Sequence, residues 1–166
     1  NKWWKKIVEI TEEAVKDSNG DYFVSITDLH PGLDALAAIR GSENLAIDLV
    51  DNPEKVKKAN FEILDVFKQI VDTLYNITSK NILGSSSWIH IWHPGKWYVT
   101  SCDFICMISP DMFDEFVLPE LKEELFWLDA SIFHLDGPGA IKHLDALLEI
   151  PELKGVQWVY GAGQPT

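Results

Sequence analysis

Residues 101–163 read SCDFICMISPDMFDEFVLPELKEELFWLDASIFHLDGPGAIKHLDALLEIPELKGVQWVYGAG, and this stretch decides the fold. It twice repeats one order: an apolar strand, a polar residue at the strand's end, then an amphipathic helix. The polar strand ends are Cys102-Asp103, His134 to Gly137 and Gln157-Trp158. Strands that alternate with helices are typical of parallel β/α units, and ligands bind where the carboxyl ends of such strands converge. The stretch therefore predicts an α/β fold and the edge that carries its chemistry.

Similar signals extend toward the N-terminus. Apolar periodicity predicts helices over 3–16, 32–39, 43–50, 53–78, 109–126 and 139–149. Strand signals cover 22–27, 98–102, 130–135 and 155–160. Residues 81–101 mix strand and turn signals with three tryptophans, and we interpret them as the start of a strand followed by an aromatic insertion. About four parallel strands result.

The number of strands limits the architecture. Four strands cannot close an eight-stranded barrel, which typically needs about 250 residues, and the chain has 166. We therefore expect one domain over residues 1–166, built of parallel β/α units as a small open sheet or as about half of a (β/α)8 TIM barrel. The chain begins with Asn1 rather than Met and stops just after a predicted strand, so we expect truncation at both ends.

Composition excludes several classes of partner. A net charge of -12 argues against nucleic acid and anionic membranes, which bind clustered Lys and Arg. No apolar run approaches the roughly 20 residues that span a bilayer, and no signal sequence opens the chain. Cys102 and Cys106 would lie about 13 Å apart along a strand, too far for a disulfide. We expect two reduced thiols, packed as small buried side chains, in a cytoplasmic protein.

Residues 108–119, ISPDMFDEFVLP, resemble a helix start of the uroporphyrinogen decarboxylase superfamily, Leu-Ser-Pro-Glu-x-(Phe/Tyr)-x-Glu-Phe-x-Leu-Pro. Three more stretches are similar in order to family motifs: the turn at 32–36, the FHLDG of 133–137, and Gln157-Trp158. The resemblance covers nearly the whole chain. It implies the third to sixth strands of a (β/α)8 barrel, completed by a second copy in a homo-oligomer or by flanking chain.

The resemblance also implies a metal site. In the cobamide methyltransferase branch, a His and a Cys match His134 and Asp136 and hold a catalytic zinc that activates a thiol. The resemblance thus implies His134 and Asp136 as zinc ligands, with a corrinoid protein as partner and a small methylated metabolite as substrate. Asp in place of Cys makes a harder, weaker site, whose third ligand the branch supplies from beyond Thr166. A loop carboxylate bonded to the backbone is the alternative for Asp136.

Three residues are catalytic candidates: Asp28, Asp103 and His134. Asp103 aligns with a polar substrate contact of the decarboxylases and is either a base, a partner for a cationic ligand, or a helix cap. Asp28 and His30 are either an acid–base pair, two metal ligands, or a turn before Pro31.

The substrate-binding candidates are His30, Asp136, Trp92, Gln157 and Trp158. Trp92 belongs to the aromatic insertion, which we interpret either as a pocket wall or as a lid or subunit contact. For Arg40 we expect an ion pair with Asp34 or Glu43.

Three functions follow from these residues. The first is a methyltransferase-type enzyme acting on a small methylated metabolite. The second is a barrel of the same family that binds or transforms a small polar metabolite without zinc. The third is a non-catalytic ligand-binding or assembly domain of the same fold. Decarboxylation of a tetrapyrrole with eight carboxylates needs cationic clamps, and the family's arginine-bearing loop is missing here, so we do not expect that activity.

Overall fold

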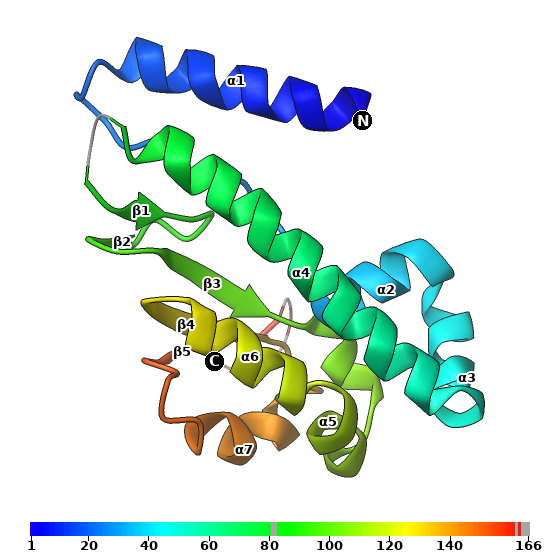
Figure 1. Ribbon diagram of the computed structural model, residues 1–166. Helices are drawn as coiled ribbons and strands as arrows, with labels where there is room; N and C mark the ends of the chain where they lie inside the picture. Colours follow the sequence, from blue (N-terminus) through cyan, green and yellow to red (C-terminus); the bar gives the residue numbers. More distant parts are fainter. Residues whose placement is uncertain (81–82, 162, 164–166) are drawn as a thin grey trace.

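The computed structural model describes residues 1–80, 83–161 and 163, and it has a mixed α/β architecture (Figure 1). The helices are α1 (Lys2–Ser18), α2 (Gly32–Arg40), α3 (Ser42–Asp51), α4 (Pro53–Thr78), α5 (Pro110–Phe116), α6 (Leu118–Trp127) and α7 (Leu144–Leu148), with 3-10 turns η1 (Asp103–Met107) and η2 (Ile141–His143). The strands are β1 (Ser85–Ser86), β2 (Trp92–His93), β3 (Trp97–Ser101), β4 (Ala130–Asp136) and β5 (Val156–Val159).

A parallel sheet of order β3-β4-β5 carries the fold, as the repeated strand and helix signals predict. Helices α5 and α6 connect β3 to β4, and α7 lies in the connection to β5. The register pairs Ser101 with His134 and His134 with Gln157. Because paired residues of neighbouring strands point to the same face, these three side chains form one row across the sheet.

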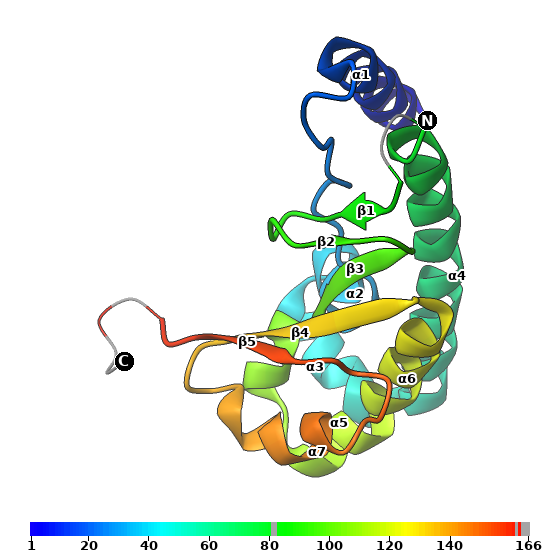
Figure 2. The same cartoon turned by 90° about the vertical axis from the view of Figure 1, so that its left-hand side faces the viewer.

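The two faces of the sheet differ in polarity. Along β4, Phe133 and Leu135 are buried, whereas His134 is half-buried and Asp136 is exposed. Phe133 and Leu135 share a core with residues of α5 and α6, and helices α4 and α6 run along one side of the sheet (Figure 2). The alternation of period two therefore places the apolar side chains against helices and the polar ones on the other face.

A second core lies beneath α4. It joins Phe67, Val71 and Leu74 of that helix to Tyr98 of β3 and to Ile26. Helix α1 packs along α4 at the outside of the molecule (Figure 1). Among the described residues, no helix combines the length and apolarity needed to cross a bilayer.

The predicted strand over 22–27 is wrong, because this segment is not part of a sheet. The Ile26 N–H donates to the Ser86 carbonyl at 2.8 Å, and the Tyr98 hydroxyl donates to the Thr27 carbonyl at 2.8 Å. Within this segment Ile26 is buried, Tyr22 and Phe23 are about half exposed, and the backbone is held by isolated hydrogen bonds. A ladder does not form because the neighbouring strand, β1, is only two residues long.

The predicted helix over 109–126 is two helices, α5 and α6, that meet at Val117. Pro119 lacks an N–H and its ring clashes with the carbonyl four residues earlier, which interrupts a continuous helix. Residues 103–107, between β3 and α5, form η1, and the helix expected over 139–149 is reduced to η2 and α7. The N-cap residue of α3 is Gly41.

The strand start expected within 81–101 is β1, which pairs antiparallel with β2. Gly84 precedes it with a φ of 105°, and a Cβ there would lie 2.2 Å from the His93 carbonyl oxygen, so only glycine fits. Residues 81 and 82 lie outside the described residues, as do the chain-end residues 162 and 164–166.

Candidate functional site

His30 extends the row of Ser101, His134 and Gln157, so that four polar side chains lie side by side near the carboxyl ends of the strands. His30 Nδ1 forms a hydrogen bond with Ser101 Oγ, and His134 Nδ1 forms one with Gln157 Oε1. The register of β3 and β4 places Ser101 beside His134, which completes the row. In the tautomer that carries the proton on Nδ1, the Gln157 amide oxygen accepts this hydrogen bond and Nε2 keeps its lone pair. His134 is therefore oriented by its neighbour and keeps a free donor atom for a ligand.

Two carboxylates adjoin this histidine. One ligand atom each of Asp103, His134 and Asp136 lies within 4.8 Å of the other two. Asp103 opens η1 directly after β3, and Asp136 ends β4, so the parallel arrangement brings them to one edge. The sequence predicts His134 and Asp136 as a pair that lacks a third ligand from within these residues. The structure places Asp103, which we treated as a separate candidate, in that position.

The charges around Asp103 repel one another. Partial desolvation raises the pKa of Asp103 above its usual value, and the nearby carboxylates of Asp34 and Asp136 raise it further. His134 and His30 act in the opposite direction. A bound cation would relieve the repulsion, since it favours the charged form of every carboxylate around it.

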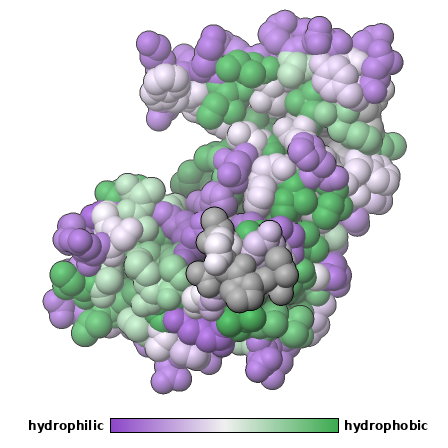
Figure 3. Space-filling view, turned by 180° about the vertical axis from the view of Figure 1, so that it is seen from behind, coloured by the Kyte–Doolittle hydropathy of each residue, from purple (hydrophilic) through white to green (hydrophobic). Residues whose placement is uncertain are grey.

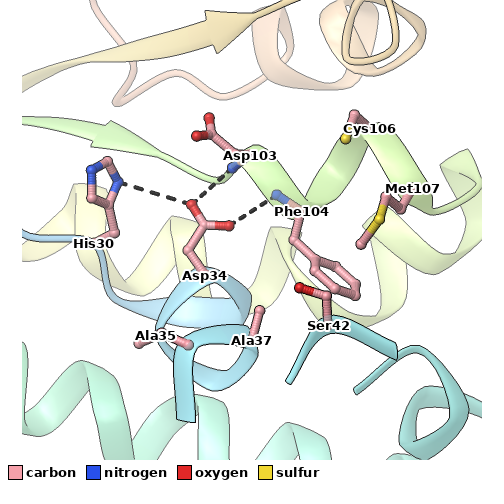
Figure 4. Close-up of a pocket in the computed structure, with 10 residues that line it drawn as sticks. His30, Asp34, Ala35, Ala37, Ser42, Asp103, Phe104, Cys106 and Met107 are labelled. Atoms are coloured by element: carbon pink, nitrogen blue, oxygen red, sulfur yellow. Dashed lines mark hydrogen bonds and ion pairs between the residues drawn. The ribbon is translucent and has the colours of Figure 1, made fainter. Parts of the chain in front are cut away.

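Asp34 fixes the position of Asp103, and this role was missing from our sequence interpretation. The Asp34 carboxylate accepts the backbone N–H of Asp103 at 2.8 Å and of Phe104 at 2.9 Å. It thereby caps η1 from the first turn of α2, and the Asp103 carboxylate points away from it (Figure 4). The sequence signal was an acid in the first turn of a helix that begins at Pro31-Gly32.

A cavity of about 480 Å³ opens beside these acids. His30, Asp34 and Asp103 form its polar side, and the other lining residues include Phe104 and Met107 (Figure 4). Volumes of this size fit small-molecule ligands, and the apolar wall with a few polar groups is typical of such sites.

Asp28 and His30 do form a pair. Asp28 Oδ1 lies 2.9 Å from His30 Nε2, and the other ring nitrogen of His30 bonds Ser101 and lies 3.9 Å from Asp34 Oδ2. Both nitrogens of His30 are therefore held by partners within the chain, which fixes the ring at the rim of the cavity.

The tryptophans occupy different places. Trp88, a tryptophan of the aromatic insertion, packs edge-on against His134 with 4.9 Å between ring centroids, and it lies 6.4 Å from the His30 ring, so it covers one end of the row. Trp92 instead packs near Phe23 at 6.0 Å, and its indole N–H donates to the Leu83 carbonyl. Trp158 pairs in register with Leu135, on the opposite face from Gln157.

Two expectations at the edge of the site need correction. Arg40 pairs with Asp48 at 2.6 Å, rather than with Asp34 or Glu43, because α3 runs back beside the end of α2. Both cysteines are free, but only Cys102 is buried, whereas Cys106 is exposed at the cavity. The reason is η1, which turns the chain outward after β3 in place of a continued strand.

No family model, curated protein or solved structure matches this chain. The function is therefore inferred from the geometry of the row, the three ligand residues and the cavity.

Proposed function

We propose that this chain is part of a uroporphyrinogen decarboxylase-like (β/α)8 barrel whose carboxyl edge binds and transforms a small polar metabolite, with a methyltransferase-type reaction as its activity. The observation that carries the proposal is the convergence of Asp103, His134 and Asp136 at the carboxyl ends of parallel strands, next to a cavity. In parallel α/β folds this edge is where substrates bind.

The residues fit a divalent cation. Two carboxylates and an imidazole whose Nε2 is free supply three donors, and exposed Asp103 and Asp136 leave room for a substrate. Such a cation supplies Lewis acidity toward a substrate oxygen or nitrogen. Oxygen donors in place of sulfur suit a hard or borderline cation and are less favourable for raising the reactivity of a bound thiolate.

The chain's own residues bind and orient. Gln157 holds the His134 ring through Nδ1, and Asp34 holds the backbone of Asp103 so that its carboxylate faces the site. With a cation bound, Asp103 acts as one of its ligands rather than as a proton acceptor. Trp88 packs against the rings of His30 and His134 and so restricts their orientation.

Metal binding tests the proposal directly. Titration of the purified protein with Zn²⁺ and Mn²⁺, followed by calorimetry, should show one site that is lost in His134→Ala and weakened at least tenfold in Asp103→Asn. His90→Ala is the matched control, because His90 is exposed on the β1–β2 loop. Equal binding by wild type and His134→Ala, or no binding by either, would refute the site.

Methyl transfer is tested separately. We expect the metal-loaded protein to transfer the methyl group of a small methylated metabolite to cob(I)alamin, which becomes methylcobalamin while the demethylated metabolite takes up a proton. We propose a corrinoid protein as the natural partner. Absence of any spectral change with wild type, where metal binds, would leave a small-metabolite enzyme without methyl transfer as the function.

Both cysteines are free, which supports our placement of the protein in the cytoplasm.

A non-catalytic assembly role is the second candidate, favoured by one observation. Trp92 and Phe23 are each 47% exposed and lie together, and Figure 3 shows several apolar patches on the surface seen from behind. If these rings join two copies, Trp92→Ala should reduce the mass measured by light scattering from dimer to monomer without affecting metal binding. A monomeric wild type would exclude this role.

A further inference from the structure

Two acids of α6 lie in the interior, away from the row. Glu120 and Glu124 are only 4% and 2% exposed, and their spacing of four residues puts them on one face of the helix. Their Oε1 atoms have no hydrogen-bond partner in the described part of the chain. A buried, ionised carboxylate without donors costs several kcal/mol, so this pair needs protons or some other source of positive charge.

An amide oxygen faces the same space. Asn60 of α4 is 1% exposed, and its amide N–H donates to the Phe116 carbonyl at 2.9 Å, but its Oδ1 is also unpartnered. Glu120 Oε2 and Asn60 Oδ1 lie 3.2 and 3.7 Å from the point where a Cβ on Gly32 would sit. Two side-chain acceptors, one from Glu120 and one from Asn60, thus lie beside the start of α2.

The charged groups near Glu120 and Glu124 do not neutralise these two carboxylates. Lys68 of α4 is the nearest cation, and its ammonium group is engaged with Glu123 at 2.8 Å. Asp34 of α2 adds negative charge, while Tyr98 and Cys102 on the β3 side are held neutral by burial, which raises the pKa of both. The N-terminal end of α2 contributes a partial positive charge only.

We infer that Glu120 and Glu124 are held as neutral acids that share their protons with Asn60, and that this buried proton latch ties α6 to α4 and to the start of α2. Two protons satisfy all three acceptors: Glu120 donates to Asn60 Oδ1, and Glu124 donates to Glu120. Burial raises the pKa of Glu120 to about 8 and that of Glu124 well above its usual range, in agreement with this arrangement.

The latch adjoins the candidate site through Gly32. Gly32 begins α2, two residues after His30 and two before Asp34. Ionised Glu120 would repel Asp34, whose carboxylate holds the Asp103 and Phe104 N–H groups. Loss of the protons at alkaline pH should therefore loosen η1 at the cavity. The candidate site would then respond to the protonation of Glu120, a residue that does not line the cavity.

Urea unfolding from pH 5 to pH 9 tests the latch. A group whose pKa is raised in the folded state binds more protons there than in the unfolded chain, so stability falls as pH rises from about 4.5 toward 8. Relative to Glu120→Gln, the wild-type folding constant should fall by up to tenfold per pH unit in this window. Glu62→Gln, at an exposed position of α4, is the control and should follow wild type.

Two further readouts keep the inference testable. If Glu120→Gln does not fold, infrared spectroscopy of the wild type at pH 7 takes the place of the unfolding comparison. A band from neutral carboxyl groups is expected, and the absence of this band would refute the latch. Coupling to the site is read from amide exchange of Asp103 and Phe104, which should accelerate above pH 8 beyond the intrinsic rate in wild type but not in Glu120→Gln, which has no carboxylate to repel Asp34. Parallel stability curves for wild type and Glu120→Gln would overturn the inference, whatever the result for metal binding.

Discussion

The Tyr98 hydroxyl holds the segment that carries Asp28 and His30, so removing it should damage both stability and site. Tyr98 is fully buried; its hydroxyl accepts the Leu29 N–H at 2.6 Å and donates to the Thr27 carbonyl at 2.8 Å. Phenylalanine keeps the edge contact with Phe67, at 5.4 Å between centroids, so Tyr98→Phe removes the hydrogen bonds alone.

The magnitude follows from the groups left behind. A buried donor or acceptor that loses its partner costs roughly 1–3 kcal/mol, and the Leu29 N–H is partly shielded from water, so we expect a loss of about 2 kcal/mol for Tyr98→Phe. Urea unfolding should show a lower midpoint with an unchanged m-value. The His30 imidazole signals should also broaden or shift, since the backbone beside it is released.

Tyr22→Phe is the matched control. The Tyr22 hydroxyl bonds Asp17 at the surface, and its removal should leave the unfolding midpoint and the His30 signals unchanged. If Tyr98→Phe unfolds at the same urea concentration as wild type, the segment 22–31 is not held by this hydroxyl, and our explanation of its position fails.

Two further predictions concern Asp34 and His143. Asp34→Ala removes the acceptor of two N–H groups at the start of η1, so it should lower the free energy of unfolding by about 1–2 kcal/mol and speed amide exchange at Asp103 and Phe104. Asp111→Asn, at an exposed position of α5, should leave that exchange unchanged. Burial lowers the pKa of His143 below its usual 6.5, so the unfolded chain takes up a proton that the folded chain does not, and stability is lost as pH falls below 6.5. His143→Gln should remove this contribution, so the difference in urea midpoint between wild type and His143→Gln should change between pH 7.5 and pH 5; a difference that stays constant over this range would contradict the prediction.

The sequence predicts the parallel units well because each strand and helix has its own local pattern. The edge residues Asp103, His134, Asp136 and Gln157 are found for the same reason, since a polar residue after an apolar strand is visible in one segment. Their mutual contacts are not visible, because they depend on the register between β3, β4 and β5. Asp103 lies near His134 because the register pairs the end of β3 with this part of β4.

The failures share a physical cause. Residues 22–27 have the composition of a strand but lack a partner long enough for a ladder, and composition does not report on partners. Trp88, Asp34 and the Glu120–Glu124 pair act through contacts with distant elements. The spacing of Glu120 and Glu124 on the face of α6 that also carries Leu121 and Leu125 was the one local sign of buried acids.

The row of Ser101, His134 and Gln157 has a consequence for how this chain tolerates length changes. Side chains alternate along β4, so deletion of one residue between Ala130 and Phe133 would turn His134 and Asp136 toward α6 and bring apolar side chains to the cavity edge. Deletion of two residues would restore the facing but shorten the strand. Natural variants of this sheet should therefore vary in their loops and helices, while β4 keeps its residue count between Ala130 and Asp136.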